Sequence, residues 1–301
     1  MTFDLDSLID RRRLSRRLTF WRVVAVLALG FLAVVLLGRS GMGLQPYVAR
    51  VTVEGMILEN PRMEQMLREI AEDSNARALI VRINSPGGST AGSEALYHAL
   101  RNVAAEKPVV AVMGTLAASG GYLTAIAADR IFARETTLTG SIGVIVEYAQ
   151  IGELLDKIGI RMETIKSAPL KGEPSLTKPL SPEAREAIQS LIDDGYDWFV
   201  GLVADRRGMD VDAVRKLADG RVFSGRQAVE NGLVDGLGGE REAREWLEAE
   251  HDVDADLPVV DFDPSPRDLL LEQLLGGAVR NILSRPGVAL DGLVSVWHPE
   301  G

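Results

Sequence analysis

Two short apolar segments that each run into a glycine-rich turn limit what this chain can fold into more than any other feature. Residues 78–83 lead into the turn at 84–89, and residues 109–113 lead into a turn that begins at Ala118. Residues of helical composition, 90–105, separate the two segments. A strand, a crossover helix and a second strand form a parallel pair. The sequence therefore predicts an α/β domain built on a parallel sheet with crossover helices.

The flanking sequence supplies further elements of both kinds. Alternating apolar and polar residues predict a strand over 47–57, and apolar residues at helical spacing predict a helix over 61–71. The other expected elements are an extended stretch at 130–146, a helix at 151–158, a strand at 161–167, a loop at 169–182 and a helix at 183–207. We expect one domain over residues 47–250, followed by a C-terminal extension, 251–301, whose role the sequence does not indicate.

The composition excludes several classes of protein. The chain has 301 residues, enough to bury a core, and its lack of cysteine rules out disulfides, thiolate nucleophiles and Cys-ligated metal sites. Its three histidines, His98, His251 and His298, are scattered, which disfavours a histidine metal site. The net charge of −10 argues against nucleic acid as a partner, because phosphate binding needs a basic surface. We expect no metal and no other cofactor.

The N-terminal region differs from the rest of the chain. Arginines are frequent up to Arg22, and the apolar segment 18–38, about 20 residues long, is sufficient to cross a bilayer as one helix. We expect a transmembrane signal anchor, because residues 38–41 form a poor cleavage site. A cleaved signal peptide and a buried core helix are the alternatives. The positive-inside rule places the basic tail, 1–17, in the cytoplasm and the remainder outside.

The chemistry is expected at the two glycine turns, because ligands of open α/β sheets bind beyond the carboxyl ends of the strands. Ser119 lies at a strand-to-helix turn, where a helix N-terminus stabilises developing negative charge. The backbone N–H of Gly120, with that of Gly87 or Gly88, would form an oxyanion hole beside its hydroxyl. The alternative is that Ser119 only caps a helix and that the glycines only shape the turns.

A serine nucleophile needs a base, and none of the histidines lies in a suitable context. A lysine can replace histidine where burial lowers the lysine pKa, since the neutral amine then accepts the hydroxyl proton. Lys171 is the best placed of the six lysines, because its neighbours are uncharged up to Glu173, whereas Lys166 is expected on a strand. From composition alone, a solvated loop lysine is the favoured interpretation of Lys171.

Five ordered blocks between residues 51 and 237 share their pattern with a known family. They are 84–88 (NSPGG), 117–122 (AASGGY), 138–144 (LTGSIGV), 165–171 (IKSAPLK) and 218–228 (ADGRVFSGRQA). Together they resemble signal peptide peptidase A, of serine peptidase family S49, in its short single-repeat form. The resemblance implies the fold shared by Clp protease and crotonase.

The resemblance also implies roles for individual residues. The family's nucleophile falls on Ser119, its general base on Lys171, and its oxyanion donors on the backbone of Gly88 and Gly120. A serine that orients the lysine amine falls on Ser141, whose other interpretation is a turn hydroxyl. Glycine follows the lysine in this chain, where aspartate is commoner in the family.

Partners and location follow from the same resemblance. It implies a membrane-anchored serine endopeptidase that degrades remnant signal peptides and other unfolded apolar peptides. Relatives form homo-oligomeric rings, octameric domes in the short form, in which serine and lysine meet across a subunit boundary. We expect a single-pass protein of the bacterial inner membrane, anchored by residues 18–38, with its N-terminus cytoplasmic and its catalytic domain periplasmic or extracellular.

Two other functions stay open at this point. A crotonase-type acyl-CoA hydratase or isomerase would use the same two turns to hold a thioester oxygen. A catalytically silent membrane scaffold is the other possibility, and an assay decides between it and an enzyme. An N-terminal anchor and a lysine-bearing loop disfavour the hydratase.

Overall fold

The computed structural model describes residues 19–27, 29–30 and 45–262. Residues 19–27 and 29–30 are helical. Among the described residues, no helix is long and apolar enough to cross a membrane. Residues 18, 28 and 31–38 of the predicted anchor lie outside the described residues, as do the basic tail, 1–17, and residues 263–301.

The strands of residues 45–262 form one sheet, which is parallel except at one pair. The strand order is β6-β5-β3-β2-β1-β8, and β4 pairs with both β3 and β7. The strands are β1 (Tyr47–Ile57), β2 (Ala76–Gly88), β3 (Val109–Ala118), β4 (Arg130–Ala133), β5 (Leu138–Gly140), β6 (Val222–Ser224), β7 (Gly236–Leu237) and β8 (Val259–Asp261). The antiparallel pair is β5 with β6. The predicted parallel sheet with crossover helices is therefore confirmed.

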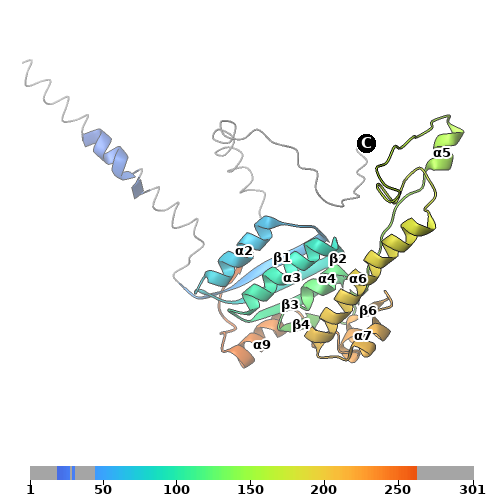
Figure 1. Cartoon of the computed structure of the whole chain (residues 1–301). Helices are drawn as coiled ribbons and strands as arrows, with labels where there is room; N and C mark the ends of the chain where they lie inside the picture. Colours follow the sequence, from blue (N-terminus) through green and yellow to red (C-terminus); the bar gives the residue numbers. More distant parts are fainter. Residues whose placement is uncertain (1–18, 28, 31–44, 263–301) are drawn as a thin grey trace, which may run out of the picture. The chain divides into compact units, whose positions relative to one another are not determined.

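Helices pack against both faces of this sheet. The helices of residues 45–262 are α2 (Pro61–Glu72), α3 (Thr90–Ala104), α4 (Gly120–Ala125), α5 (Gly152–Lys157), α6 (Pro182–Arg207), α7 (Val211–Leu217), α8 (Gly225–Glu230) and α9 (Glu240–His251) (Figure 1). Of these, α5 has no buried residue and does not pack on the sheet. Leu79, Val81 and Ile83 of β2 pack into the larger core, whereas Ala78 and Ile80 pack into a smaller core with α9. A strand buried on both faces reads as a continuous apolar run, which is why 78–83 shows no alternation.

Residues 143–183, here called the arm, contain no buried residue. The arm includes α5, which Figure 1 shows beyond the N-terminal end of α6. The predicted strand at 161–167 is wrong, because these residues pair with no strand and Met162 and Ile165 are exposed. A strand forms only where a neighbour satisfies its backbone groups, and residues 161–167 have no such neighbour.

The last described residues complete one edge of the sheet. β8 pairs in parallel with the start of β1, and Phe262 stacks on Tyr47 with ring centroids 5.9 Å apart. Arg50 of β1 donates hydrogen bonds to Asp261 at 2.5 and 2.7 Å and to Glu240 of α9 at 2.9 Å. The compact unit runs through Phe262, so the sheet takes in the first part of the range assigned to a C-terminal extension.

Candidate active site

The two glycine turns at the carboxyl ends of β2 and β3 are in contact. A Cβ atom on Gly87 would lie 2.8 Å from the amide nitrogen of Gly120 and 2.9 Å from Cβ of Ser119. Gly87 also has a φ of 104°, which a residue with a side chain rarely adopts. Glycine at position 87 therefore lets the first turn pack directly against the second, with Ser119 at their junction.

Ser119 has a backbone conformation that is rare for a residue with a side chain. Its φ is 53° and its ψ is −121°. Its N–H donates to the carbonyl oxygen of Gly140 at 2.8 Å, which ties the turn to β5. Such conformations persist only where the surrounding structure enforces them, and they gather at active sites.

The side chain of Ser119 also differs from those of other serines that begin helices. Ser119 occupies the N-cap position of α4 but makes no capping hydrogen bond. In the other described helices that begin with a serine cap, Ser89, Ser181 and Ser224 each accept a bond from a backbone N–H. Their φ values, −67° to −73°, are ordinary. The capping interpretation of Ser119 therefore has no support, and its hydroxyl is available for chemistry.

The backbones of Gly88 and Gly120, the predicted oxyanion donors, lie close together. A Cβ atom on Gly120 would lie 3.2 Å from the amide nitrogen of Gly88 and 2.2 Å from Oγ of Ser93. A Cβ atom on Gly88 would lie 1.8 Å from the carbonyl oxygen of Ile57. Neither position accepts a side chain. The two turns thus bring the backbones of Gly88 and Gly120 close together at a cavity that Ser119 also lines.

Ser85 shapes the first turn, a role that the sequence analysis missed. Its side chain is fully buried, and its Oγ accepts a hydrogen bond from the N–H of Gly87 at 3.0 Å. A serine that bonds the backbone two residues ahead is a recognised turn motif, so the spacing of Ser85 and Gly87 carried the signal.

A cavity of about 90 Å³ adjoins Ser119. Ser119, Gly88 and Gly120 form part of its wall, together with Thr90 and Ser93 of α3. The remaining walls are apolar or small and come from Leu123 of α4, Gly143, Val144 and Ile145 of the arm, and Gly195, Trp198 and Phe199 of α6. A small apolar group bound there would lie beside the hydroxyl of Ser119.

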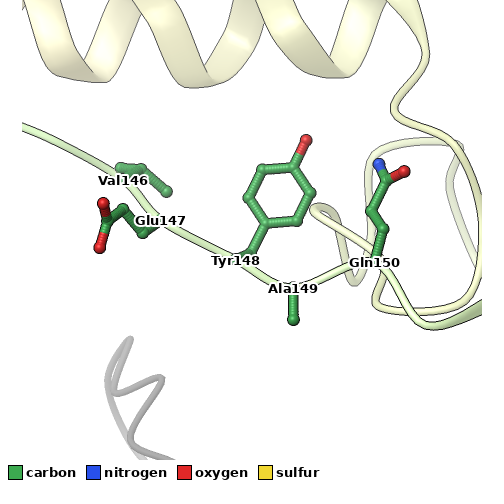
Figure 2. A pocket seen from close by; sticks show the side chains of 5 residues that line it. All are labelled: Val146, Glu147, Tyr148, Ala149 and Gln150. Carbon is green, nitrogen blue, oxygen red and sulfur yellow. The ribbon is translucent and has the colours of Figure 1, made fainter.

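The arm leaves this cavity through a segment without regular structure. Val146, Glu147, Tyr148, Ala149 and Gln150 line an open hollow along it (Figure 2). The side chains of Tyr148 and Ala149 point to opposite sides of the backbone (Figure 2). This alternation is typical of extended chain, whose backbone groups can pair with an extended peptide.

Lys171 lies in the arm and not beside Ser119. It is exposed, it does not line the cavity, and its N–H donates to the carbonyl oxygen of Ala168 at 3.1 Å. Its amine has no hydrogen-bond or ion-pair partner within the described residues. A single chain therefore does not bring Ser119 and Lys171 together.

Lys166, the other lysine of the same sequence block, is already paired. Its Nζ lies 2.5 Å from Oε1 of Glu173. This hydrogen bond, more than any other contact, holds the pKa of the Glu173 carboxyl below its ordinary value. Of these two lysines, Lys171 is the one whose amine has no partner within the described residues.

Ser141 lies next to the residue that anchors Ser119. Its N–H donates to the carbonyl oxygen of Arg221 at 2.8 Å, and its φ of 49° is again rare for a residue with a side chain. Ser141 is half-buried. Because Lys171 is exposed on the arm, one chain provides no contact between these two side chains.

The histidines are not part of this arrangement. His98 is exposed on α3, 3.9 Å from Glu94, and His251 packs against Trp246 at the end of α9. Neither lines the cavity at Ser119. His298 lies outside the described residues.

Comparisons with known proteins point in the same direction as this geometry. The family model described as peptidase family S49 matches residues 101–254, and the model described as Clp protease matches residues 57–139. A Synechocystis protein named as a protease is 40% identical over 234 residues, 76% of this chain and 83% of that protein. An Enterococcus faecium protein named as signal peptide peptidase SppA is 39% identical over 236 residues, 78% of this chain and 68% of that protein.

A solved structure has a similar fold. The membrane-bound stomatin-specific protease 1510-N superposes with a TM-score of 0.50 at 18% sequence identity. The match covers 73% of this chain and 99% of that one. At this identity the likeness concerns the fold alone.

Proposed function

Because this chain belongs to peptidase family S49 and is a serine peptidase, we propose that Ser119 is its nucleophile and Lys171 its general base. The observation that carries the first assignment is the conformation of Ser119, with a φ of 53° and no capping bond. The free amine of Lys171, beside a paired Lys166, supports the second. Gly88 and Gly120 supply the oxyanion donors, and Ser141 orients the amine.

The proposed reaction is amide hydrolysis through an acyl-enzyme. The neutral amine of Lys171 takes the proton of Ser119 as Oγ attacks the scissile carbonyl carbon, and the carbonyl electron pair moves to oxygen. The N–H groups of Gly88 and Gly120 stabilise that charge. The resulting ammonium then passes the proton to the leaving nitrogen, and the C–N bond breaks. In deacylation the neutral amine takes a proton from water as the water oxygen bonds to the acyl carbon; the C–Oγ bond then breaks, Oγ of Ser119 regains the proton from the ammonium, and the acid is released.

We place the lysine of each site in a neighbouring subunit of a homo-oligomeric ring, an octamer in the form we expect. The exposure of Lys171 in one chain supports this arrangement. So does the apolar character of the arm, which carries exposed large apolar side chains on a segment without buried residues: Ile145, Val146, Ile151, Leu154, Ile158, Ile160, Met162, Ile165, Leu170 and Leu176. Burial of this surface by a second copy would remove it from water.

The proposed substrates are remnant signal peptides and other unfolded apolar peptides. The apolar walls of the cavity beside Ser119 suit such chains. We further propose that residues 18–38 anchor the enzyme in the bacterial inner membrane, with residues 1–17 in the cytoplasm and the catalytic domain outside. The apolar sequence 23–37 and the arginines that precede it support this topology.

A fluorophosphonate probe tests the two catalytic assignments. The wild type should be labelled on Ser119, and Ser119→Ala should not be labelled. Lys171→Ala should be labelled about 100-fold more slowly or worse, since a general base contributes at least that factor. Lys178→Ala, which removes another exposed lysine of the arm, is the matched control and should label normally.

A synthetic signal peptide tests the substrate class. Mass spectrometry should detect internal cleavage by the wild type and none by Ser119→Ala. Labelling of Ser119 without any peptide cleavage would remove the peptide assignment. Equal labelling of Lys171→Ala and wild type would remove Lys171 from the mechanism.

A further inference from the structure

Ser93 of α3 carries a hydroxyl that is buried and has no partner. The residue is 3% exposed. Among buried side-chain nitrogen and oxygen atoms of the described residues, Ser93 Oγ and Arg130 Nε are the ones without a hydrogen bond. An unpaired buried hydroxyl destabilises the folded state, so a native structure that keeps one calls for an explanation.

Other buried hydroxyls nearby are all paired. Ser85 Oγ accepts from Gly87 at 3.0 Å, Thr124 Oγ1 donates to the carbonyl oxygen of Gly120 at 2.9 Å, and Thr139 Oγ1 donates to that of Ala117 at 2.6 Å. These bonds shape the two turns. Ser93 thus differs from these neighbouring residues, because its buried hydroxyl has no hydrogen-bond partner.

The position of Ser93 indicates what the hydroxyl can bind. It lines the cavity that also contains Ser119, Gly88 and Gly120. The point at which a Cβ atom on Gly120 would lie is 2.2 Å from Ser93 Oγ and 3.2 Å from the amide nitrogen of Gly88. The hydroxyl of Ser93 and the amide of Gly88 therefore converge on the same side of Gly120.

We propose that Ser93 is a third oxyanion donor, a catalytic residue that hydrogen-bonds the carbonyl oxygen of the substrate beside the two backbone amides. This inference rests on the proposed role of Ser119. When Oγ of Ser119 bonds to the carbonyl carbon, the electron pair of the C=O double bond moves to oxygen, and the O–H of Ser93 donates to that oxygen without losing its proton. The pair returns when the C–N bond breaks.

The proposal predicts that Ser93→Ala lowers the activity of the enzyme without lowering its stability. The rate constant kcat should fall about 10- to 100-fold, because a bond to a developing oxyanion is charge-assisted, while KM changes little. The unfolding temperature should stay equal to that of the wild type or rise, since an unpaired group is removed. Thr124→Val, which removes a paired buried hydroxyl, is the contrast and should lower the unfolding temperature.

Inhibitors provide a readout that a structural role would not affect. A peptide aldehyde forms a hemiacetal with Ser119 that places an oxygen among the donors, whereas the corresponding peptide amide binds without that bond. In Ser93→Ala, the affinity for the aldehyde should fall by about the same factor as kcat/KM. The amide should bind as it does to the wild type.

Several results would overturn the inference. Unchanged kcat in Ser93→Ala would do so, as would a joint loss of activity and unfolding temperature, or equal weakening of the aldehyde and the amide. If Ser93→Ala does not fold, Ser93→Cys replaces the hydroxyl with a weak donor and should show the same fall in kcat; wild-type kcat there rejects the proposal. Full activity of Ser119→Ala would instead reject the nucleophile itself, so the two failures are distinguishable.

Discussion

The N–H of Ser119 donates to the carbonyl oxygen of Gly140 at 2.8 Å, and Ser141 directly follows Gly140 in the chain. The bond therefore links Ser119 to the segment that contains Ser141. Both have positive φ, and Gly140 between them has a φ of 80°. The turn at Ser119 is therefore held by β5 as well as by α4, where the N–H of Leu123 donates to the carbonyl oxygen of Ser119 at 2.9 Å.

The first prediction concerns the strained backbone conformation of Ser119. Ser119→Gly should abolish peptide cleavage and raise the free energy of unfolding by about 1 kcal/mol, because glycine adopts positive φ without a steric penalty. Chemical denaturation measures the change. Ser89→Ala, which removes a true N-cap, should lower the same free energy by about 1 kcal/mol. A destabilised Ser119→Gly would contradict the strained conformation.

The pH dependence of cleavage tests the proposed base. Lysine amines are protonated at neutral pH in water, and only the neutral amine accepts the proton of Ser119. We therefore expect kcat/KM to rise from about pH 6 to about pH 10 and then to level off. Lys178→Ala should keep this profile. A flat profile over the whole range would speak strongly against Lys171.

Acid should weaken the sheet edge at β8. The hydrogen bond from Arg50 is the main reason that the pKa of Asp261 is lowered from 3.8. A carboxyl with a lowered pKa stabilises the fold above its ordinary pKa, and this contribution disappears as pH falls through the folded value. Between about pH 5 and about pH 3, the unfolding temperature of the wild type should fall more steeply than that of Asp261→Asn. Asp256→Asn, an exposed control, should follow the wild type.

The apolar surface of the arm is predicted to hold subunits together. Ile165 is fully exposed in one chain. Ile165→Asp should shift the sedimentation coefficient to that of smaller species and reduce cleavage, with the unfolding temperature of the domain unchanged. Glu163→Gln, on the same segment, should leave the assembly intact. An unaltered assembly in Ile165→Asp would exclude this part of the arm from the interface.

Much of the fold could be predicted from the sequence because its signals are local. The runs at 78–83 and 109–113 were correctly assigned to adjacent parallel strands, since burial on both faces leaves a continuous apolar pattern. The segment 161–167 was wrongly assigned to a strand, because no strand lies beside it to pair with. β8 was missed because its three residues carry too little pattern to stand apart from the range around them.

The residues of the candidate site also differ in whether the sequence could predict them. Ser119 and its glycines could be proposed as site residues because the pattern of a turn lies in consecutive residues. Ser93 could not, because its significance lies in the lack of a partner, which only three-dimensional packing reveals. The sequence also contains no pattern that predicts what the amine of Lys171 contacts, because Lys171 is exposed to solvent in a single chain.

The most direct test of the central claim is cleavage of a signal peptide by mixed subunits. Ser119→Ala and Lys171→Ala are inactive separately under the proposed mechanism, but a ring assembled from both contains boundaries where an intact serine meets an intact lysine. Co-refolded mixtures should therefore recover a substantial fraction of wild-type activity, with a maximum near equal proportions. No recovery at any proportion, in mixtures shown to co-assemble, would contradict a site shared between chains.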